Sequence, residues 1–412
     1  MELINNKYQI DTIDVTRLPE KYGSPVYVYS TKKMTEQYNR LKNAFKTEVD
    51  LRINYACKAL TNINVLKLFK SLGSGLDAVS IQEVKLALKA GYKPKDILFT
   101  PNGVSMEEID EGIKLGVHLN IDNISILEQF GDKYGGKVPV GIRLNPHVMG
   151  GGNLKISTGH IDSKFGISVY QLPHLLRVIE TNKMTIDGLH MHTGSDILDV
   201  EIFIKAANII LETAKNFKNL NYIDLGSGFK VPYKPDDYST DIEEFGTEIT
   251  KAYTAFCKDY GKKITLMFEP GKFLVSEAGT FLVRVNVLKH TLATVFAGVD
   301  SGLNHLIRPM FYDSYHHIVN VSNPCGRQRI YTVVGYICET DTFGWNRKIS
   351  EITEGDILAF KNAGAYCFSM SSNYNSRFRP AEVIIHEGKD YLVRKREEME
   401  DLLRNQIEID FK

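Results

Sequence analysis

The sequence predicts an α/β fold, a (β/α)8 TIM barrel followed by a smaller all-β domain. Between residues 50 and 270, short β-prone apolar runs alternate with longer segments of helical periodicity, which indicates a parallel sheet whose strands are joined by helices. Eight such runs lie in about 220 residues, as in a TIM barrel. An open doubly wound sheet is the alternative. After Gly279 the runs follow one another without helices, which indicates a β-barrel or β-sandwich.

The expected barrel elements are short and regularly spaced. Helices are expected between the strands, and Ser80 with Glu83 forms a capping-box pattern at the start of one of them. In chain order the strands are residues 51–56, 75–79, 97–100, 118–121, 138–144, 186–190, 222–225 and 264–268, and the clearest helices are 62–72, 80–90 and 202–217.

Two domains are expected because 412 residues exceed the size at which one core usually stops growing. The barrel should span residues 26–279 and the β domain residues 280–412, with residues 1–25 joining the β domain. The β domain should contain strands at 281–287, 330–334, 356–360 and 381–386, and a charged terminal helix over 395–410.

Composition argues for a small-molecule partner. The 50 basic residues balance the 50 acidic ones, so no surplus of positive charge points to nucleic acid or an anionic membrane. The five cysteines are scattered without a CxxC pair, which fits a reducing cytoplasm better than a disulfide framework or a zinc site. The start of the chain has no signal-peptide pattern, and no apolar run reaches the roughly 18 residues of a membrane helix. A cytoplasmic protein is therefore expected.

Chemically useful residues follow four of the predicted strands, where the loops of a barrel form its catalytic face. Lys58 ends the first strand, His192 follows the sixth, the run Gly226-Ser227-Gly228 follows the seventh, and Glu269 follows the eighth. Glycines after strand seven are typical of backbone phosphate sites, although they also form ordinary turns. Taken singly, the lysine is usually a solvated charge.

Two cofactors suit such a rim. His190 and His192 are two residues apart and could ligate a metal ion, but strands four and five end without an obvious further ligand, so no metal is expected. Pyridoxal phosphate needs a lysine that carries it, a phosphate cradle, a flat group against its ring and a carboxylate at the pyridine nitrogen. Lys58, the glycine run, His192 and Glu269 can fill these roles.

Eight ordered motifs resemble those of bacterial diaminopimelate decarboxylases, which belong to the barrel-type family of pyridoxal-phosphate decarboxylases together with ornithine and arginine decarboxylases. The resemblance covers almost the whole chain. The motifs are Tyr55-Ala56-Cys57-Lys58-Ala59, Ser157-Thr158-Gly159, Ser163-Lys164-Phe165-Gly166, His190-Met191-His192-Thr193-Gly194-Ser195, Glu269-Pro270-Gly271, Arg308-Pro309, Cys338-Glu339-Thr340 and Ser372-Asn373-Tyr374-Asn375.

The resemblance implies roles for these residues. Lys58 would carry the cofactor, His192 would stack on its ring, and Glu269 would pair with the ring nitrogen. Cys338 would return a proton to the substrate Cα. Further cofactor contacts are implied for Ser195, Gly226, Ser227, Gly228, Gly271 and Tyr374, and substrate contacts for Lys272, Arg308, Tyr312, Glu339 and Tyr374.

The resemblance also implies a homodimer with shared active sites, in which Cys338 and Glu339 of one chain reach Lys58 of the other. The expected reaction is decarboxylation of meso-2,6-diaminopimelate at its D-configured centre, which yields L-lysine and carbon dioxide. Alternatives are decarboxylation of ornithine, arginine or carboxynorspermidine, or an inactive regulator that keeps the fold. Ornithine decarboxylases carry aspartate where this chain has Glu339, which favours diaminopimelate.

Three departures from the family pattern are visible. Lys272 stands where the family usually has arginine after Glu-Pro-Gly, so a point charge replaces a bidentate guanidinium. Lys272 is expected to serve an anion, either the substrate carboxylate or the cofactor phosphate. The glycine run is Gly-Ser-Gly rather than three glycines, and the segment that begins at Cys338 is one residue shorter than usual.

Overall fold

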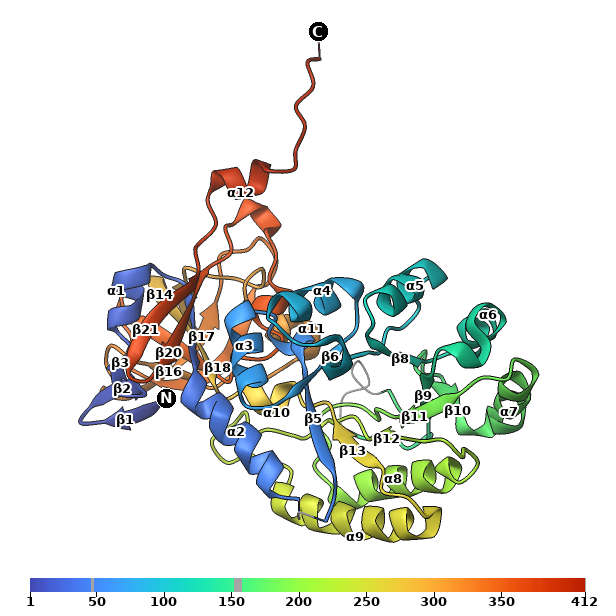
Figure 1. The fold of residues 1–412 in the computed structure, drawn as a ribbon. Coiled ribbons are helices and arrows are strands. Elements are labelled where there is room, and N and C mark those ends of the chain that lie inside the picture. The colour runs from blue at the N-terminus through green and yellow to red at the C-terminus, as the bar shows by residue number, and fades with distance from the viewer. Residues whose placement is uncertain (46–47, 152–157, 412) are drawn as a thin grey trace. The chain divides into compact units, whose positions relative to one another are not determined.

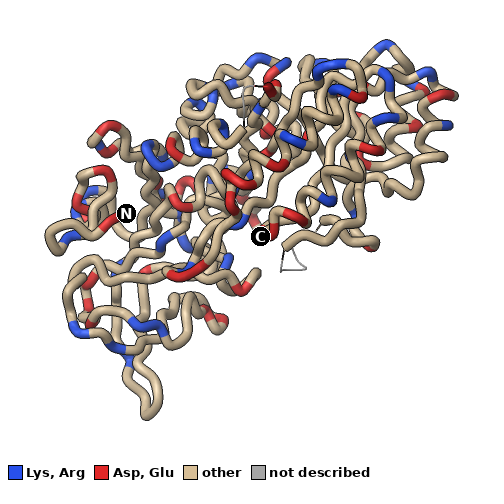
Figure 2. The backbone as a smooth tube through the Cα atoms, turned by 90° about the horizontal axis from the view of Figure 1, so that it is seen from below, with Lys and Arg blue, Asp and Glu red and all other residues tan. Residues whose placement is uncertain are grey.

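A computed structural model describes residues 1–45, 48–151 and 158–411. The chain divides into two compact units. We call residues 35–231 and 238–274 the barrel unit, and residues 1–34, 232–237 and 275–412 the β unit. Basic and acidic residues are interspersed along both (Figure 2). No helix within the described ranges is long and apolar enough to cross a membrane.

The barrel unit contains eight parallel strands that close into a ring, which confirms the predicted fold (Figure 1). The ring closes because β8 pairs with β9 as well as with β7, and the two-residue strand β10 (Ile167–Ser168) is added beside β9. The ring strands are β5 (Leu51–Ala56), β6 (Gly75–Ala78), β7 (Ile97–Phe99), β8 (His118–Ile121), β9 (Val140–Asn145), β11 (Ile186–His190), β12 (Tyr222–Asp224) and β13 (Thr265–Phe268).

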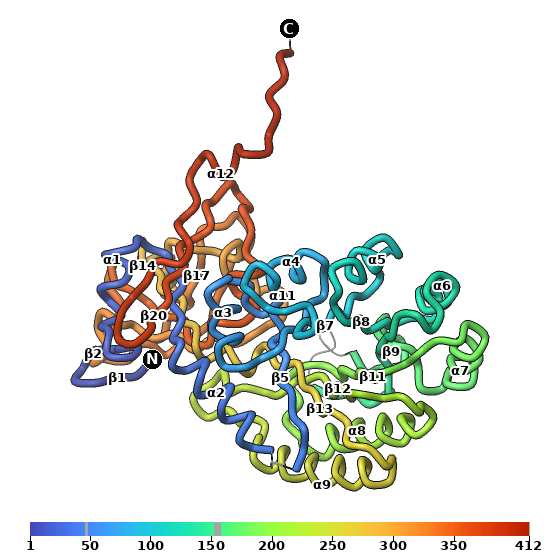
Figure 3. The backbone as a smooth tube through the Cα atoms, viewed as in Figure 1, coloured from blue at the N-terminus to red at the C-terminus, as the bar shows by residue number. Residues whose placement is uncertain are grey.

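Helices connect the strands and end near the predicted residues. The Ser80 side chain caps α4 by accepting from the Glu83 N–H at 3.2 Å, while the Glu83 carboxylate accepts from the Val79 N–H at 2.8 Å. Helices α8 and α9 lie side by side (Figures 1 and 3). The helices are α2 (Thr31–Asn43), α3 (Ile63–Ser71), α4 (Ile81–Lys89), α5 (Met106–Lys114), α6 (Ile124–Tyr134), α7 (Leu172–Thr181), α8 (Val200–Ala214), α9 (Ile242–Tyr260) and α10 (Lys272–Val275).

The β unit is built on a sheet of mostly antiparallel strands in the order β18-β17-β15-β14-β4-β20-β21, with β19 beside β14 and β16 beside β19. Its core gathers Val28, Leu282, Ala359 and Val383 from neighbouring strands. The strands are β4 (Val26–Ser30), β14 (Gly279–His290), β15 (Val295–Val299), β16 (Ile318–Asn320), β17 (Gln328–Val334), β18 (Thr342–Ser350), β19 (Ile357–Lys361), β20 (Ala381–His386) and β21 (Lys389–Arg394).

The N-terminal part of the β unit holds a hairpin sheet of β1 (Glu2–Ile4), β2 (Lys7–Ile10) and β3 (Ile13–Asp14), followed by α1 (Arg17–Tyr22). Strand β4 pairs with β14 and β20, so residues 26–34 group with the β unit rather than with the barrel. All five β4 residues are buried, and their backbone groups need ladder partners, which the β unit supplies.

The predicted terminal helix over residues 395–410 is mostly wrong. Only α12 (Met399–Leu403) is helical, and an extended segment follows it (Figure 1). Ile407 and Ile409 are exposed and β-branched, so this segment has neither a packing surface nor the propensity that would extend the helix.

Candidate active site

Lys58 lies in a short 3₁₀ turn, Cys57–Ala59, directly after β5. Its ammonium forms an ion pair with Asp77 at the end of the neighbouring strand β6, with 3.0 Å between Nζ and Oδ2. Asp77 is only 1% exposed, and this burial, together with nearby Glu269, raises its pKa to about 6 although Lys58 opposes the shift. A lysine and a readily protonated carboxyl therefore share one rim of the barrel.

Glu269 follows β13 and is buried. Its Oε2 lies 2.9 Å from Nε2 of His190 at the end of β11. Desolvation raises the pKa of Glu269 and lowers that of His190 well below its usual range, so the histidine is neutral. Within the described residues, the second oxygen Oε1 of Glu269 is buried and meets no N–H donor. This buried oxygen can therefore accept an N–H donor, which the neighbouring carboxyl groups of Asp77 and Asp224 cannot supply.

Asp224 and Arg143 complete this buried group of charges. Desolvation, reinforced by Glu269, raises the pKa of Asp224 well above its ordinary value. Arg143 on β9 is buried, and its positive charge opposes the rise in the pKa of Glu269. Ligand atoms of His190, Asp224 and Glu269 lie within 4.8 Å of one another, a spacing that would also suit a metal ion.

His190 and His192, the pair weighed as alternative metal ligands, contact different partners. His190 faces Glu269, whereas Nδ1 of His192 accepts the Ser227 N–H at 3.4 Å. His192 is partly exposed beside the glycine run. Desolvation lowers its pKa well below the usual range, which favours the neutral imidazole that can lie flat against a ring.

The glycine run after β12 is pressed against the loop after β11. Gly226 and Gly228 have φ of 67° and 122°. A Cβ on Gly226 would lie 2.4 Å from the Met191 carbonyl oxygen, and one on Gly228 would lie 2.4 Å from the Gly194 carbonyl oxygen. Only glycine allows both the conformation and the close approach of the two loops.

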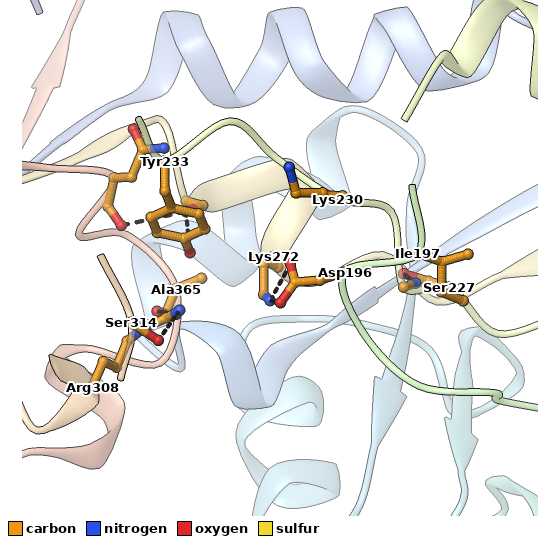
Figure 4. A network of polar contacts seen from close by, with 12 residues as sticks. Asp196, Ile197, Ser227, Lys230, Tyr233, Lys272, Arg308, Ser314 and Ala365 are labelled. Carbon is orange, nitrogen blue, oxygen red and sulfur yellow. Dashed lines mark hydrogen bonds and ion pairs between the residues drawn. The ribbon is translucent and has the colours of Figure 1, made fainter. Parts of the chain in front are cut away.

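Ser195 and Gly271 lie on the loops that flank this run, and each is followed by a charged residue. Nζ of Lys272 lies 2.8 Å from both carboxylate oxygens of Asp196 (Figure 4). The lysine that was expected to bind the substrate carboxylate or the cofactor phosphate is thus paired with an aspartate of the same chain. The Lys272 side chain is 8% exposed.

In the β unit, two motifs come together that lie far apart in the sequence. The Tyr374 hydroxyl donates a short hydrogen bond to Oε1 of Glu339, and the Asn375 amide donates to Sγ of Cys338 at 3.2 Å. Cys338 and Glu339 are exposed, and Tyr374 is 46% exposed. The hydrogen bond to Glu339 is the main cause that raises the pKa of Tyr374.

Arg308 and Tyr312 begin and end α11 (Arg308–Tyr312). The Arg308 guanidinium is buried and donates to the Ala365 carbonyl oxygen at 2.9 Å and to Ser314 Oγ at 3.3 Å (Figure 4). It also lies 5.2 Å from the centroid of the Tyr233 ring. Tyr312 is partly exposed.

Sequence reasoning missed several residues of the site. Asp77, Arg143 and Asp224 are charged residues within short, mostly apolar strands that are buried on both faces, and such a charge is rare unless it is paired or functional. That signal could have identified all three. Asp196 lies in a loop and carries no such signal, and Asn375 lies in a short 3₁₀ helix (Tyr374–Ser376), where only the motif that contains it was recognised. Ser157 lies outside the described residues.

Comparisons with known proteins agree with this geometry. The family model described as "Pyridoxal-dependent decarboxylase, pyridoxal binding domain" matches residues 31–276. A diaminopimelate decarboxylase from Methanothermobacter thermautotrophicus is 40% identical over 95% of this chain and 94% of its own length. One from Campylobacter jejuni is 34% identical over 94% of this chain and 97% of its own.

Solved structures of decarboxylases are also similar to this chain. The diaminopimelate decarboxylase from M. jannaschii in co-complex with L-lysine has a TM-score of 0.89 at 31% identity, and covers 99% of this chain and 98% of its own. A lysine/ornithine decarboxylase from Vibrio vulnificus has a TM-score of 0.77 at 21% identity over 90% of this chain and 97% of its own, which shows a shared fold.

Proposed function

The chain belongs to the diaminopimelate decarboxylase family of pyridoxal-dependent decarboxylases, and we propose that it converts meso-2,6-diaminopimelate to L-lysine and carbon dioxide. The observation that carries this proposal is the near full-length similarity to relatives of that name, one of which was solved with L-lysine. The cofactor is pyridoxal phosphate. When bound, it supplies an electron sink for the pair of electrons that carbon dioxide leaves at Cα.

The buried group of charges fits this cofactor. A protonated pyridine nitrogen would bring the N–H donor that Oε1 of Glu269 lacks, and Arg143 helps to keep Glu269 ionised. His190 holds the other oxygen and so fixes the plane of the carboxylate. A metal ion bound by His190, Asp224 and Glu269 would compete for the same carboxylate.

Lys58 is the proposed covalent carrier of the cofactor. An amine attacks only when it is neutral, so Lys58 must lose a proton before it can form the bond. Asp77 accepts a hydrogen bond from Nζ and has a pKa near 6, which makes it a suitable acceptor for that proton. Ser195, the Gly226–Gly228 run and Gly271 would cradle the phosphate, and His192 would lie against the ring.

The substrate-binding residues are proposed on the β unit. Cys338 would return a proton to Cα, Glu339 would accept the distal ammonium, and Arg308 with Tyr312 would hold the distal carboxylate. Tyr374 would contact both substrate and cofactor phosphate. The hydrogen bonds from Tyr374 to Glu339 and from Asn375 to Cys338 support this grouping, because they hold the carboxylate and the thiol in one exposed cluster.

We further propose a cytoplasmic homodimer in which this exposed cluster completes the site of the partner chain. An exposed cysteine, carboxylate and tyrosine in a hydrogen-bonded group are what a shared site would present before a second chain covers it. The five cysteines, all within the described ranges, are free thiols, as a reducing compartment would keep them.

The competing substrates are ornithine, arginine and carboxynorspermidine. Ornithine and lysine have an ammonium at the far end but no carboxylate, so only diaminopimelate would offer the Arg308 guanidinium an anion at that end. A site built to hydrogen-bond a group of one substrate rejects an analogue that lacks this group by about a thousandfold or more. An inactive regulator would release no carbon dioxide from any of these substrates.

The test is to measure carbon dioxide released by the purified protein with pyridoxal phosphate and each diamino acid. We expect kcat/KM for the meso isomer to exceed that for ornithine or lysine by about a thousandfold. Arg308→Met should lower kcat/KM for diaminopimelate far more than any residual ornithine activity, and Arg308→Lys, which keeps the charge, should lose less. Comparable kcat/KM for ornithine and diaminopimelate in the unmodified protein would refute the substrate assignment and leave the decarboxylase assignment intact.

A further inference from the structure

Three loops at the carboxyl end of the barrel contact one another in a closed triangle. The loop after β11 meets the loop after β12 through a hydrogen bond from Ile197 N–H to the Gly228 carbonyl oxygen at 2.8 Å. The loop after β12 meets the loop after β13 through Glu269 N–H and the Gly226 carbonyl oxygen, also at 2.8 Å. The third side joins the loops after β11 and β13, and there Asp196 and Lys272 form their ion pair (Figure 4).

This third contact differs from the other two because it is made by side chains. Both Asp196 oxygens lie 2.8 Å from Nζ of Lys272, so the two charges compensate each other. The Lys272 side chain is 8% exposed and that of Asp196 is 30% exposed, which places most of the pair away from water. A bound phosphate nearby would be repelled by Asp196 alone, but a neutral pair removes that penalty.

We propose that Asp196 and Lys272 are a positioning pair, which holds Ser195 and Gly271 at the spacing needed to cradle the cofactor phosphate. Each member directly follows one of those two residues in the sequence. The inference rests on the proposed phosphate site, and it assigns Lys272 a different task from binding an anionic ligand directly. Neither residue touches reacting atoms in this role.

The backbone at Asp196 determines which variant is informative. Asp196 has φ of 61°, a left-handed conformation that asparagine adopts readily and alanine does not. Asp196→Asn therefore removes the charge without adding backbone strain. Lys272→Met removes the other charge with similar side-chain length, and Lys272→Arg keeps a cation that can pair with Asp196 through two hydrogen bonds.

The experiment measures the dissociation constants of pyridoxal phosphate and of pyridoxal, which lacks the phosphate, by titrating the apoprotein and following absorbance. We expect Asp196→Asn and Lys272→Met each to weaken pyridoxal phosphate binding by about tenfold or more, because each breaks the ion pair that joins the two loops. Pyridoxal binding should change much less, and Lys272→Arg should stay within about threefold of the unmodified protein.

Two controls separate positioning from general damage. Lys85→Met removes an exposed pair with Glu111 between α4 and α5, where Nζ and Oε1 lie 2.7 Å apart, and should leave both constants unchanged. The double variant Asp196→Asn with Lys272→Met contains no unpaired charge and should bind more tightly than the product of the single losses predicts. Equal weakening of pyridoxal and pyridoxal phosphate would mean a merely structural role and would overturn the proposal.

Direct ligand binding by Lys272 predicts a different pattern. If Lys272 bound the phosphate itself, Asp196→Asn would remove a competing carboxylate and tighten pyridoxal phosphate binding. If Lys272 bound the substrate carboxylate, Lys272→Met would raise KM for diaminopimelate with cofactor affinity unchanged. Either result would refute the positioning role. The cofactor titrations need no turnover, so they remain decisive even if the proposed substrate is wrong.

Discussion

The barrel unit and the β unit carry two chemically different groups of site residues. In the barrel, Asp77, Asp224 and Glu269 are buried, and desolvation is the main cause that raises each of their pKa values. In the β unit, Glu339 and Tyr374 are exposed, and the hydrogen bond to Glu339 is the largest cause that raises the pKa of Tyr374. The barrel group is preorganised by its own fold, whereas the β-unit group is open to solvent.

This difference indicates which functions each group can perform in a single chain. Buried, fixed charges can hold a cofactor and control its protonation without help from another chain. An exposed thiol and carboxylate cannot exclude water from a reacting centre by themselves. We therefore expect the barrel group to bind cofactor independently, and the β-unit group to act only where a partner covers it.

The largest effect should come from removing the proposed carrier of the cofactor in the barrel. Lys58→Ala should lower kcat by about a thousandfold or more, because the proposed covalent link to the cofactor is lost. In the unmodified protein, borohydride reduction followed by peptide mass spectrometry should place the pyridoxyl group on Lys58. Lys67→Ala, on the exposed face of α3, is the control and should keep full activity. Labelling of a different lysine would show that the barrel group has been misassigned.

The next effect tests whether the β-unit group acts in the partner chain. Cys338→Ala should lower kcat by about 10²-fold or more through loss of the proton donor, while cofactor binding persists. When Cys338→Ala and Lys58→Ala dimers are dissociated and mixed, the two variants should form heterodimers. In each heterodimer one of the two sites holds both Lys58 and Cys338. Activity should then recover to about a quarter of the unmodified level with random exchange. Heterodimers that form without any recovery would contradict site sharing.

The difference between the buried barrel group and the exposed β-unit group also explains how much could be predicted from the sequence. The barrel strands were predicted to within about two residues because parallel strands buried on both faces give short, continuous apolar runs. Lys58, His192 and Glu269 followed from their positions after strands, which is where a barrel places its site. Asp77 and Asp224 were overlooked although each is a charge inside such a run.

The rest could not be derived from periodicity. Cys338 lies in a loop and Tyr374 in a short 3₁₀ helix of the β unit, so only the family resemblance marked them. Their contacts with Asn375 and Glu339 depend on tertiary structure. The ion pair of Lys272 with Asp196 joins residues far apart in the sequence in the same way. The end of the chain was predicted as a helix from charge and composition, but α12 is short, and the apolar side chains of Ile407, Ile409 and Phe411 beyond it are exposed rather than packed.

The smallest effect, on stability rather than activity, tests whether burial controls the barrel group. The pKa of Asp77 is raised from 3.8 to about 6 in the folded apoprotein. Because the folded state binds this proton more tightly than the unfolded state, Asp77 favours folding below pH 4, and this contribution is lost as the pH rises through 6. A shift of about two pKa units corresponds to about 3 kcal/mol. Asp77→Asn cannot titrate, so the unfolding free energy of the unmodified apoprotein should fall by most of that amount relative to Asp77→Asn between pH 4 and pH 7.

Urea denaturation of both apoproteins at several pH values between 4 and 7.5 measures this difference. Asp110→Asn is the control, because hydrogen bonds from Lys133 and Tyr134 lower the pKa of Asp110. Asp110 therefore stabilises the fold above the ordinary pKa of an aspartate and loses this contribution only below about pH 4, so Asp110→Asn and the unmodified protein should give nearly parallel profiles over this pH range. The Asp77 effect should also persist at high salt, since buried charges are screened less than exposed ones. Parallel pH profiles for Asp77→Asn and the unmodified protein would show that burial does not set the protonation of the barrel group, and Asp77 would then be an ordinary ionised partner of Lys58.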